Sequence, residues 1–364
     1  MIIPLLIHPN YQSELQDCLS HWNLFGTVAV SAVPPADVNA LEEIVKRIGG
    51  QVDLMIGLES PTDKDALRLL NAGAASIICL DPENAARDLP SIPEDRMTFI
   101  FNDDSTDQAI PKGQVVSLVE SAPAAEQMAN RIAELEMARV DCLVDAEFLN
   151  QNTAVILDFF KQVLVTDRPD GLWSTLIVDP LGIALGLAYS NEESLLHALE
   201  NRCGTYWSRS RDGLWIKGET SGATQKLLGV RMDCDRDCLR FMVTQDPPGF
   251  CHRNTHTCFG EERTIQSVLQ RLSERMSEAD EKSFTHKLAQ DAKMLETKLL
   301  EEAKELSDAS QTDDKHEIAW EAADVLYFSL VAMLKNGVGL DKVYQELARR
   351  MNRVVRRKNK LESD

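Results

Sequence analysis

The chain has 364 residues, and its contents of 44% hydrophobic and 26% charged residues are typical of a soluble globular protein. Asp and Glu number 58 against 38 Lys and Arg, so the formal net charge of −20 disfavours binding to nucleic acid or to an anionic membrane surface. No apolar run approaches the ~20 residues of a membrane span, and the first residues lack the regions of a signal peptide. We therefore expect a cytoplasmic protein of two or three domains, with its 8 cysteines present as reduced thiols or metal ligands.

The first part of the chain alternates β-branched apolar runs with amphipathic stretches. Strands are predicted over residues 2–7, 27–33, 52–58, 76–80, 98–102 and 115–119. Helices are predicted over residues 35–48, 63–71 and 123–139. This alternation favours βα units around a parallel sheet, which would form a partial, barrel-like domain over residues 1–165.

The composition changes twice after this domain. Residues 172–260 hold half of the Gly and most of the Trp and Cys, and strand-like runs at 214–217 and 239–244 predict a β-rich domain over residues 166–260. From residue 261 onward there is no Pro, and Ala, Leu, Glu, Lys and Arg dominate, which predicts an all-α domain over residues 261–364. Turns are expected at 308–314 and 336–339. The predicted fold is therefore multidomain, with α/β, β-rich and all-α parts.

Three aspartates alternate with other residues in the second half of the predicted β-rich domain. In a strand, the side chains of Asp233, Asp235 and Asp237 would share one face. Three carboxylates on one face repel one another, and a hard cation such as Mg²⁺ would relieve that repulsion. Solvated turns also contain runs of Asp, and this reading would be preferred for any one of the three taken alone.

Four cysteines lie close to these aspartates: Cys234, Cys238, Cys251 and Cys258. Thiolates suit a softer ion, and a set of three would leave a fourth position open for water, as in a catalytic zinc site. Cys251 and Cys258 are suited to a loop that returns on one ion, and His252 and His256 lie between them. A single cysteine is more often a small buried hydrophobic residue, but the joint cluster favours a metal site.

Residues 206–222 combine glycines, hydroxyl groups and basic side chains, which together could cradle a phosphate. Trp207 or Trp215 could stack on a base. An ordinary hairpin with a buried Trp has a similar composition. The candidate substrate-binding residues are Trp207, Arg209, Arg211, Lys217, Glu219, Thr220 and Ser221.

Taken together, residues 206–222, 233–237 and 251–259 resemble phosphoribosyl-AMP cyclohydrolase of histidine biosynthesis over about residues 168–260. The resemblance implies that the three aspartates bind Mg²⁺ and that three cysteines, contributed by two subunits of a homodimer, bind Zn²⁺. Those cysteines would be Cys234, Cys251 and Cys258, and Cys238 is not excluded as a ligand. A zinc-bound hydroxide would attack C6 of the adenine ring and open the N1–C6 bond, with His252 as the candidate proton shuttle.

Acidic residues also pair at helical spacing in the C-terminal part of the chain. Glu301 and Glu305 are four residues apart and Glu321 and Asp324 are three apart, so each pair shares one helix face. Like charges at this spacing cost roughly 0.2–0.5 kcal/mol per pair, unless divalent cations bind between them. A solvated acidic face is the alternative, but apolar residues surround both pairs.

This pattern resembles the all-α nucleoside-triphosphate pyrophosphohydrolases and, more narrowly, phosphoribosyl-ATP pyrophosphohydrolase over about residues 265–360. The resemblance implies Mg²⁺ held by five carboxylates, with the catalytic role centred on Glu302 and Asp324; the five are Glu301, Glu302, Glu305, Glu321 and Asp324. Lys287 and the basic C-terminal helix would neutralise phosphate charge. For the run from Arg349 to Lys358, a solvated helix end that complements the helix dipole is an equal alternative. Phe328 stands where the family often has His.

Residues 1–165 weakly resemble a fragment of the phosphoribosyl isomerase (βα)-barrel of the same pathway. His8 lies where that barrel has a catalytic Asp, so we expect a domain without catalytic activity. Fungal multifunctional chains carry a similar leader, often with a dehydrogenase appended. Because this sequence stops at Asp364, we expect no dehydrogenase domain.

These patterns predict a bifunctional hydrolase that converts phosphoribosyl-ATP to phosphoribosyl-AMP and pyrophosphate and then opens the purine ring. One alternative is a general house-cleaning nucleoside-triphosphate pyrophosphatase with a structural zinc domain. Another is a zinc-stabilised scaffold without enzymatic activity. Turnover of dUTP or ITP above phosphoribosyl-ATP would favour the first alternative, and absence of any turnover with both metals supplied would favour the second.

Overall fold

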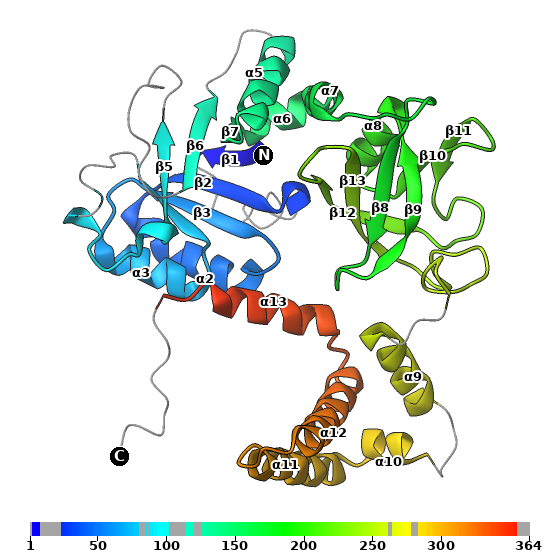
Figure 1. The fold of residues 1–364 in the computed structure, drawn as a ribbon. Coiled ribbons are helices and arrows are strands. Elements are labelled where there is room, and N and C mark those ends of the chain that lie inside the picture. Colours follow the sequence, from blue (N-terminus) through cyan, green and yellow to red (C-terminus); the bar gives the residue numbers. More distant parts are fainter. Residues whose placement is uncertain are drawn as a thin grey trace. The chain divides into compact units, whose positions relative to one another are not determined.

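The structure, a computed structural model, describes residues 2–7, 23–79, 85, 87–101, 114–119, 125–260, 264–277 and 283–354 (Figure 1). The chain divides into two compact units, one of Met1–Cys258 with Gln345–Asp364 and one of Phe259–Tyr344. Among the residues described, every helix is too short or too polar to traverse a bilayer. The three-domain division of the sequence stays a prediction.

Seven parallel strands of the first unit form a closed barrel. They are β1 (Ile2–Ile7), β2 (Thr27–Val33), β3 (Asp53–Leu58), β4 (Ser76–Cys79), β5 (Met97–Phe101), β6 (Gln114–Val119) and β7 (Asp141–Asp145). Each strand pairs with the next, and β7 pairs back onto β1 through the register Ile2 to Cys142. The predicted βα domain is therefore confirmed, and its sheet closes on itself because of a seventh strand that the sequence patterns did not reveal. His8, Leu80, Asn102 and residues 123–124 of the predicted elements lie outside the described residues.

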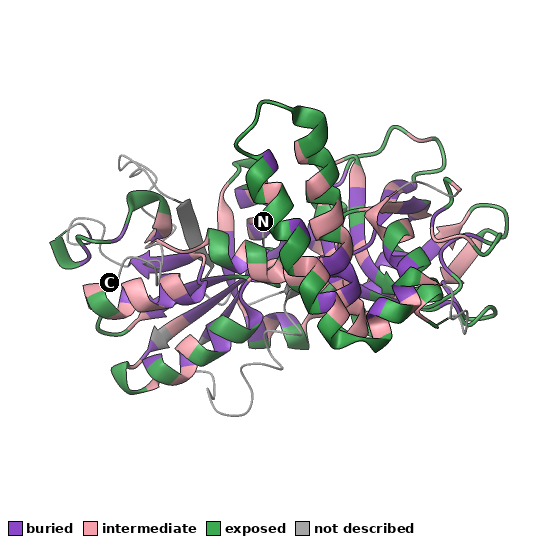
Figure 2. Cartoon of the chain, turned by 90° about the horizontal axis from the view of Figure 1, so that it is seen from below, coloured by how far each residue is buried: buried purple, intermediate pink, exposed green. Residues whose placement is uncertain are grey.

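Alternate side chains of the barrel strands point to opposite faces. One set, which includes Ile3, Met55 and Leu143, forms a small apolar cluster of its own. The other set, which includes Val28 and Leu54, belongs to the main core of the unit. Both sets are buried. Helices cover the outside of such a barrel, so its strands are apolar at nearly every position. Figure 2 shows the buried residues concentrated on the strands.

Helices follow most of the barrel strands. They are α2 (Val38–Ile48), α3 (Asp63–Ala72), α5 (Ala125–Met137), α6 (Ala146–Gln151) and α7 (Thr153–Val163), with short 3-10 turns at Asn23–Phe25, Pro35–Asp37 and Glu94–Arg96. In α2 the buried residues Val38, Leu41, Val45 and Ile48 recur at intervals of three or four residues, which places them on one face. The side chain of Thr62 caps the start of α3 by accepting a hydrogen bond from the Asp65 N–H.

Helix α7 is buried on most of its circumference and packs on both α5 and α8 (Glu192–Asn201). Val155, Ile156, Phe159, Phe160 and Val163 are each at most 3% exposed. Burial of one such side chain contributes about 1.5–3 kcal/mol, more than the ~1 kcal/mol of a helix cap. Packing therefore dominates the stability of α7, while Asp158 and Lys161 lie on its less buried side.

The central part of the chain is β-rich, as predicted. A four-stranded sheet has the order β12-β13-β8-β9, and β10 and β11 form a separate hairpin. The strands are β8 (Trp173–Val178), β9 (Ala184–Ser190), β10 (Thr205–Ser208), β11 (Gly213–Ile216), β12 (Gln225–Met232) and β13 (Cys238–Gln245). In this sheet β13 pairs parallel with β8, while the other pairs are antiparallel. Rings of Tyr206, Trp215, Phe241 and Phe250 meet in the core between the sheet and the hairpin.

The second unit is helical, as predicted. Its helices are α9 (Ile265–Ser277), α10 (Phe284–Gln290), α11 (Ala292–Ala309) and α12 (Lys315–Lys335), and α13 (Leu340–Met351) leads back to the first unit. Helices α11 and α12 pack together, and the Asp314 carboxylate caps α12 by accepting hydrogen bonds from the N–H groups of His316 and Glu317. The turns lie where the sequence placed them.

Candidate functional sites

Asp233, Asp235 and Asp237 come together, with one carboxylate oxygen of each within 4.8 Å of the others. They lie in the exposed turn between β12 and β13, not on one face of a strand as the alternation predicted. The turn is closed by Asp233 Oδ1, which accepts hydrogen bonds from the N–H groups of Asp237 at 3.0 Å and Cys238 at 3.1 Å. The Asp233 side chain and the charges of Asp235 and Asp233 raise the pKa of Asp237. The turn thus gathers three carboxylates in a small space.

Cys251 and Cys258 are brought together by the loop that follows β13. The Cys251 N–H donates to the Thr255 carbonyl at 3.2 Å, and the Cys258 N–H donates to the Leu185 carbonyl at 2.7 Å. Hydrogen bonding from the Arg253 backbone lowers the pKa of the Cys251 thiol, whereas burial and the adjacent Cys251 raise that of Cys258. Of the two, Cys251 is the more readily ionised.

The other two cysteines lie with the aspartate turn. Cys234 is exposed, and Cys238 begins β13 with its thiol donating to the Leu239 carbonyl at 3.4 Å. Burial raises the pKa of Cys238. Within the described residues of one chain, Cys234 does not join Cys251 and Cys258 in a group of ligand atoms within 4.8 Å. A single chain therefore assembles two of the three predicted thiols.

A pocket of about 360 Å³ contains most of the predicted cyclohydrolase residues. Predicted residues among those that line it are Arg211, Lys217, Glu219, Thr220, Ser221, Cys251, His252 and Cys258. The Lys217 ammonium is buried and donates to the carbonyls of Ala223 at 3.1 Å and Gly249 at 3.4 Å. Burial lowers the pKa of Lys217, and the thiols of Cys258 and Cys251 act in the opposite direction. A cation, hydroxyl groups and thiols thus converge on one hollow.

Trp207 and Arg209 do not line this pocket. They line a second, more open hollow of about 470 Å³ together with Tyr189. The Arg209 guanidinium lies 4.1 Å from the centre of the Tyr189 ring, and that of Arg168 lies 4.3 Å from it. Trp215 lines both hollows, so it is the side chain that separates them.

Sequence patterns placed His256 in the cysteine cluster but missed the two residues that hold it there, Asp179 and Gln245. Asp179 Oδ1 accepts the N–H groups of Leu181 and Ile183, both at 2.9 Å, while its Oδ2 lies 3.3 Å from His256 Nε2. Gln245 Nε2 lies 3.0 Å from the His256 carbonyl and 3.2 Å from Nδ1. Since Gln245 donates to Nδ1, the ring proton resides on Nε2 and is donated to Asp179. The contact between Asp179 and His256 joins residues that are 77 positions apart, so it leaves no periodic pattern in the sequence.

In the helical unit, carboxylates from two helices meet. Oxygens of Glu302 and Glu305 on α11 and of Glu321 on α12 lie within 4.8 Å of one another. Burial, together with the charges of Glu305 and Asp324, raises the pKa values of Glu302 and Glu321. Glu321 Oε2 is buried without a hydrogen-bond partner. Four like-charged groups and an unpartnered oxygen thus lie in one part of the helical unit.

The remaining predicted residues of this unit have different surroundings. Glu301 pairs with Lys298 at 2.7 Å, and Lys287 is exposed on α10. Thr285 and Tyr327 share a hydrogen bond of 2.9 Å that joins α10 to α12. The edge of the Phe328 ring packs against Phe284, at 6.3 Å between ring centres. Residues 356–358 of the basic tail lie outside the described residues.

Comparisons with known proteins agree with the two sites, one in the β-rich domain and one in the helical unit. The phosphoribosyl-AMP cyclohydrolase family model matches residues 186–260, and the phosphoribosyl-ATP pyrophosphohydrolase model matches residues 265–351. The histidine biosynthesis bifunctional protein his7 of Schizosaccharomyces pombe is 32% identical over an alignment of 401 positions, gaps included, which covers 98% of this chain and 94% of that protein. The bifunctional protein HisIE of Bacillus subtilis is 38% identical over 51% of this chain and 94% of its own length. The trifunctional protein of Komagataella pastoris is 48% identical over 54% of this chain, which spans 23% of that protein.

The Asp179 contact predicts the behaviour of the cysteine loop. Asp179→Asn keeps the oxygen that accepts two backbone N–H groups but turns an NH₂ group toward the His256 N–H, which leaves a donor without an acceptor. Such a loss costs about 1–3 kcal/mol, so we expect the Phe250 and Cys251 amides to exchange hydrogen roughly tenfold faster. Hydrogen exchange measured by mass spectrometry checks this. The exposed Asp212→Asn variant is the control, and equal protection in the two variants would contradict the assignment.

Proposed function

This chain belongs to the family of bifunctional phosphoribosyl-AMP cyclohydrolases and phosphoribosyl-ATP pyrophosphohydrolases of histidine biosynthesis, and we propose that its two sites act in sequence on one nucleotide. It is a hydrolase, with one domain for each reaction. The helical site would release pyrophosphate from phosphoribosyl-ATP, and the β-rich site would open the adenine ring of the resulting phosphoribosyl-AMP. The observation that carries the proposal is the convergence of Lys217, Glu219, Cys251 and Cys258 on one pocket, separate from the carboxylates of α11 and α12.

For ring opening, we assign Zn²⁺ to the thiols of Cys234, Cys251 and Cys258. The donor set fits this ion because thiolates are its preferred ligands and the pKa of Cys251 is already lowered. When bound, Zn²⁺ would supply Lewis acidity, which brings the pKa of water near ~7. His252 lines the same pocket and would move the proton, while Lys217, Thr220 and Ser221 would orient the substrate. Free thiols require a reducing compartment, which favours the cytoplasm.

Because Cys234 does not reach the other two thiols within one chain, we propose that two copies complete each zinc site. Cys234 of one copy would meet Cys251 and Cys258 of a second, in a homodimer. The exposed aspartate turn would accompany Cys234 and bring Mg²⁺ to the same substrate. The separation of the thiols within one chain supports this arrangement.

For pyrophosphate release, we assign Mg²⁺ to the carboxylates of α11 and α12. The cluster fits a hard cation because one oxygen of Glu321 is buried without a partner and the neighbouring charges repel one another. When bound, Mg²⁺ would neutralise charge on the triphosphate. Glu302, Glu305, Glu321 and Asp324 would hold it, and the exposed Lys287 would approach the phosphates. Glu301, which pairs with Lys298, would contribute through the charge of the cluster.

One assay tests the sequential reaction as a whole. Purified protein supplied with phosphoribosyl-ATP, Mg²⁺ and Zn²⁺ should release pyrophosphate first and then show the absorbance change of purine-ring opening. Turnover of dUTP or ITP in preference to phosphoribosyl-ATP would contradict the proposal.

Cysteine variants test the shared zinc site. Cys234→Ser and Cys251→Ser alone should each abolish ring opening but retain pyrophosphate release. When equal amounts are mixed and allowed to exchange subunits, half of the dimers contain one intact site, so about a quarter of the ring-opening activity should return. Cys203→Ser, whose thiol contacts Thr205 at 3.2 Å, is the control and should stay active. No recovery on mixing, despite proven exchange, would refute a site shared between copies.

Asp324→Asn tests whether the two reactions use separate sites. Loss of one carboxylate should reduce pyrophosphate release on the order of 10³-fold, because several kcal/mol of transition-state stabilisation depend on the metal. Phosphoribosyl-AMP supplied directly should still be opened at close to the wild-type rate. Asp308→Asn, which removes a surface partner of Lys304, serves as the control. Loss of both activities in a folded Asp324 variant would mean one shared site.

Glu302→Gln should change stability in opposite directions with and without metal. Glu302 is only 9% exposed among like charges, so its replacement removes repulsion worth about 0.5 kcal/mol. Without Mg²⁺ the melting temperature of the helical unit should therefore rise by roughly 2–4 °C. With Mg²⁺ the variant should gain less stability than the wild type, because one ligand is missing. Calorimetry with and without EDTA checks both signs against Glu296→Gln, and a variant that Mg²⁺ stabilises as fully as the wild type would remove Glu302 from the site.

A further inference from the structure

Two neighbouring helices of the barrel end at glycines. Helix α2 ends before Gly49 and Gly50, and α3 ends before Gly73. Gly50 and Gly73 have φ values of +90° and +125°, a conformation that favours glycine. The last carbonyl groups of a helix have no partner within it, and they carry the negative end of the helix dipole. The end of α3 is therefore a place where a cation and a donor are favoured.

Arg349, near the end of α13, supplies both the cation and the hydrogen-bond donor. Its guanidinium Nη1 donates to the Ala72 carbonyl at 2.8 Å, across 277 residues of sequence. The side chain is only 10% exposed, and its charge is paired because Nε and Nη2 each donate to the Glu346 carboxylate at 2.7 Å. This pairing lowers the pKa of Glu346 to about 2. Neither a phosphate contact nor a solvated helix end describes Arg349, because its donors are already used and it is buried.

Two more contacts extend this attachment beyond the helix. Asn352 Nδ2 donates to the Gly73 carbonyl at 3.1 Å, and the Val354 N–H donates to Asn71 Oδ1 at 3.2 Å. The Val354 side chain packs against the main core of the unit. The segment therefore follows the end of α3 for several residues.

The glycines let α13 approach this closely. A Cβ on Gly50 would lie 2.0 Å from the Gln345 carbonyl oxygen and 2.9 Å from the Arg349 nitrogen. A Cβ on Gly73 would lie 2.4 Å from Arg349 Cγ. Side chains at these positions would occupy the space that α13 fills, so the surface is shaped for a helix.

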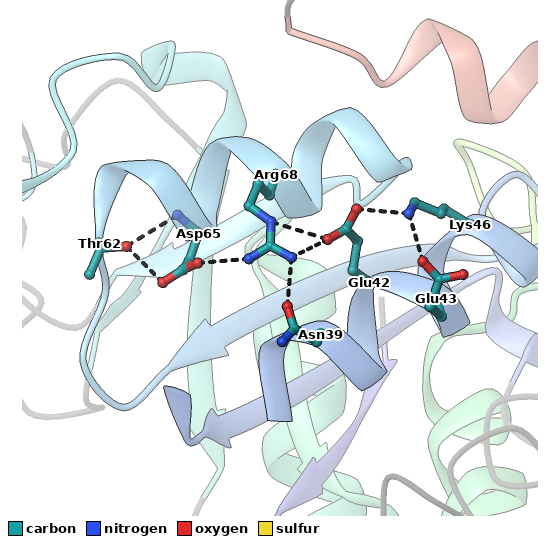
Figure 3. Close-up of polar contacts among 7 residues, drawn as sticks. All are labelled: Asn39, Glu42, Glu43, Lys46, Thr62, Asp65 and Arg68. Atoms are coloured by element: carbon teal, nitrogen blue, oxygen red, sulfur yellow. Dashed lines mark hydrogen bonds and ion pairs between the residues drawn. The ribbon is translucent and has the colours of Figure 1, made fainter. Parts of the chain in front are cut away.

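A network of polar side chains holds α2 and α3 together beside this surface (Figure 3). Arg68 of α3 donates to Glu42 and Asn39 of α2, and it also pairs with Asp65. Lys46 binds the other side of Glu42 at 2.8 Å. Because both helices contribute glycines to the surface, fixing one helix against the other also fixes the surface.

We propose that the barrel is an internal anchor, and that its function in this chain is to hold the end of α13. The helical unit leaves the first unit after Cys258 and returns to it at Gln345. The chain thus enters the helical unit once and returns once. On its return it is also held at the barrel, by Arg349, Asn352 and Val354. A chain segment attached at both ends samples less space than one attached at a single end. The barrel thus limits the motion of the helical unit without contributing a catalytic group.

Hydrogen exchange on the full-length chain tests this anchor, with Arg349→Met compared against Arg350→Met. Arg350 has the same partner, Glu346, but its side chain is 59% exposed. In Arg349→Met we expect amides of residues 345–354 and of residues 49–52 and 71–75 to exchange about tenfold faster. Arg350→Met should leave both sides of the contact within about twofold of the wild type.

The two sides of the contact distinguish an anchor from a local role of Arg349 in α13. Faster exchange confined to residues 345–354 would overturn the proposal, as would equal effects in the two variants. Asn352→Ala is a milder second variant and should deprotect residues 71–75 to a smaller extent. Neither activity enters this measurement, so it can fail while the proposed reactions hold, or succeed while they fail.

Discussion

A single apolar core, shared by the barrel and the β-rich sheet, is the constraint on which the first unit depends. Its members run from Ile2 on the first strand, through Phe159 and Phe160 on the buried face of α7, to Phe250. Phe250 immediately precedes Cys251, so the thiol pocket begins where the core ends. Burial of this chain of side chains contributes far more than any single polar contact, at about 1.5–3 kcal/mol each. The loop with the two thiols can therefore be short and polar, because the core fixes the residue from which it starts.

The acidic clusters stand in contrast to this core, since both oppose folding as long as no cation is present. The aspartate turn is exposed, where water screens its charges, and it needs only the hydrogen bonds to Asp233 to close. The carboxylates of α11 and α12 are partly buried, where screening is weaker, and a Glu321 oxygen lacks a partner. Packing between the two helices outweighs this repulsion. The helical unit therefore folds despite the mutual repulsion of these carboxylates.

The barrel holds another part of the chain in position. Its interior is filled with apolar side chains such as Ile3, Met55 and Leu143, which makes it a packed core and not a pore. Its polar contacts with the rest of its unit include those at the end of α3, where the dipole of one helix meets the guanidinium of Arg349. Glycines at helix ends, which usually serve only to stop a helix, here also leave room for a second one. A barrel with seven strands can hold another helix in this way.

The sequence by itself determined the types of the elements and the chemistry of the sites, because these are local properties. Alternating apolar runs identified six of the barrel strands, helical spacing joined Glu321 to Asp324, and the cyclohydrolase segments resembled a family through adjacent residues. Tertiary structure alone decided the closure of β1 on β7, the bond between Asp179 and His256, and the separation of Cys234 from Cys251. It also placed Arg349, part of a basic run for which phosphate binding and a solvated helix end were equal alternatives, at the end of a distant helix. Periodicity reports that a face is buried but not which partner covers it, and a backbone carbonyl that accepts a distant donor leaves no trace in the residue types around it.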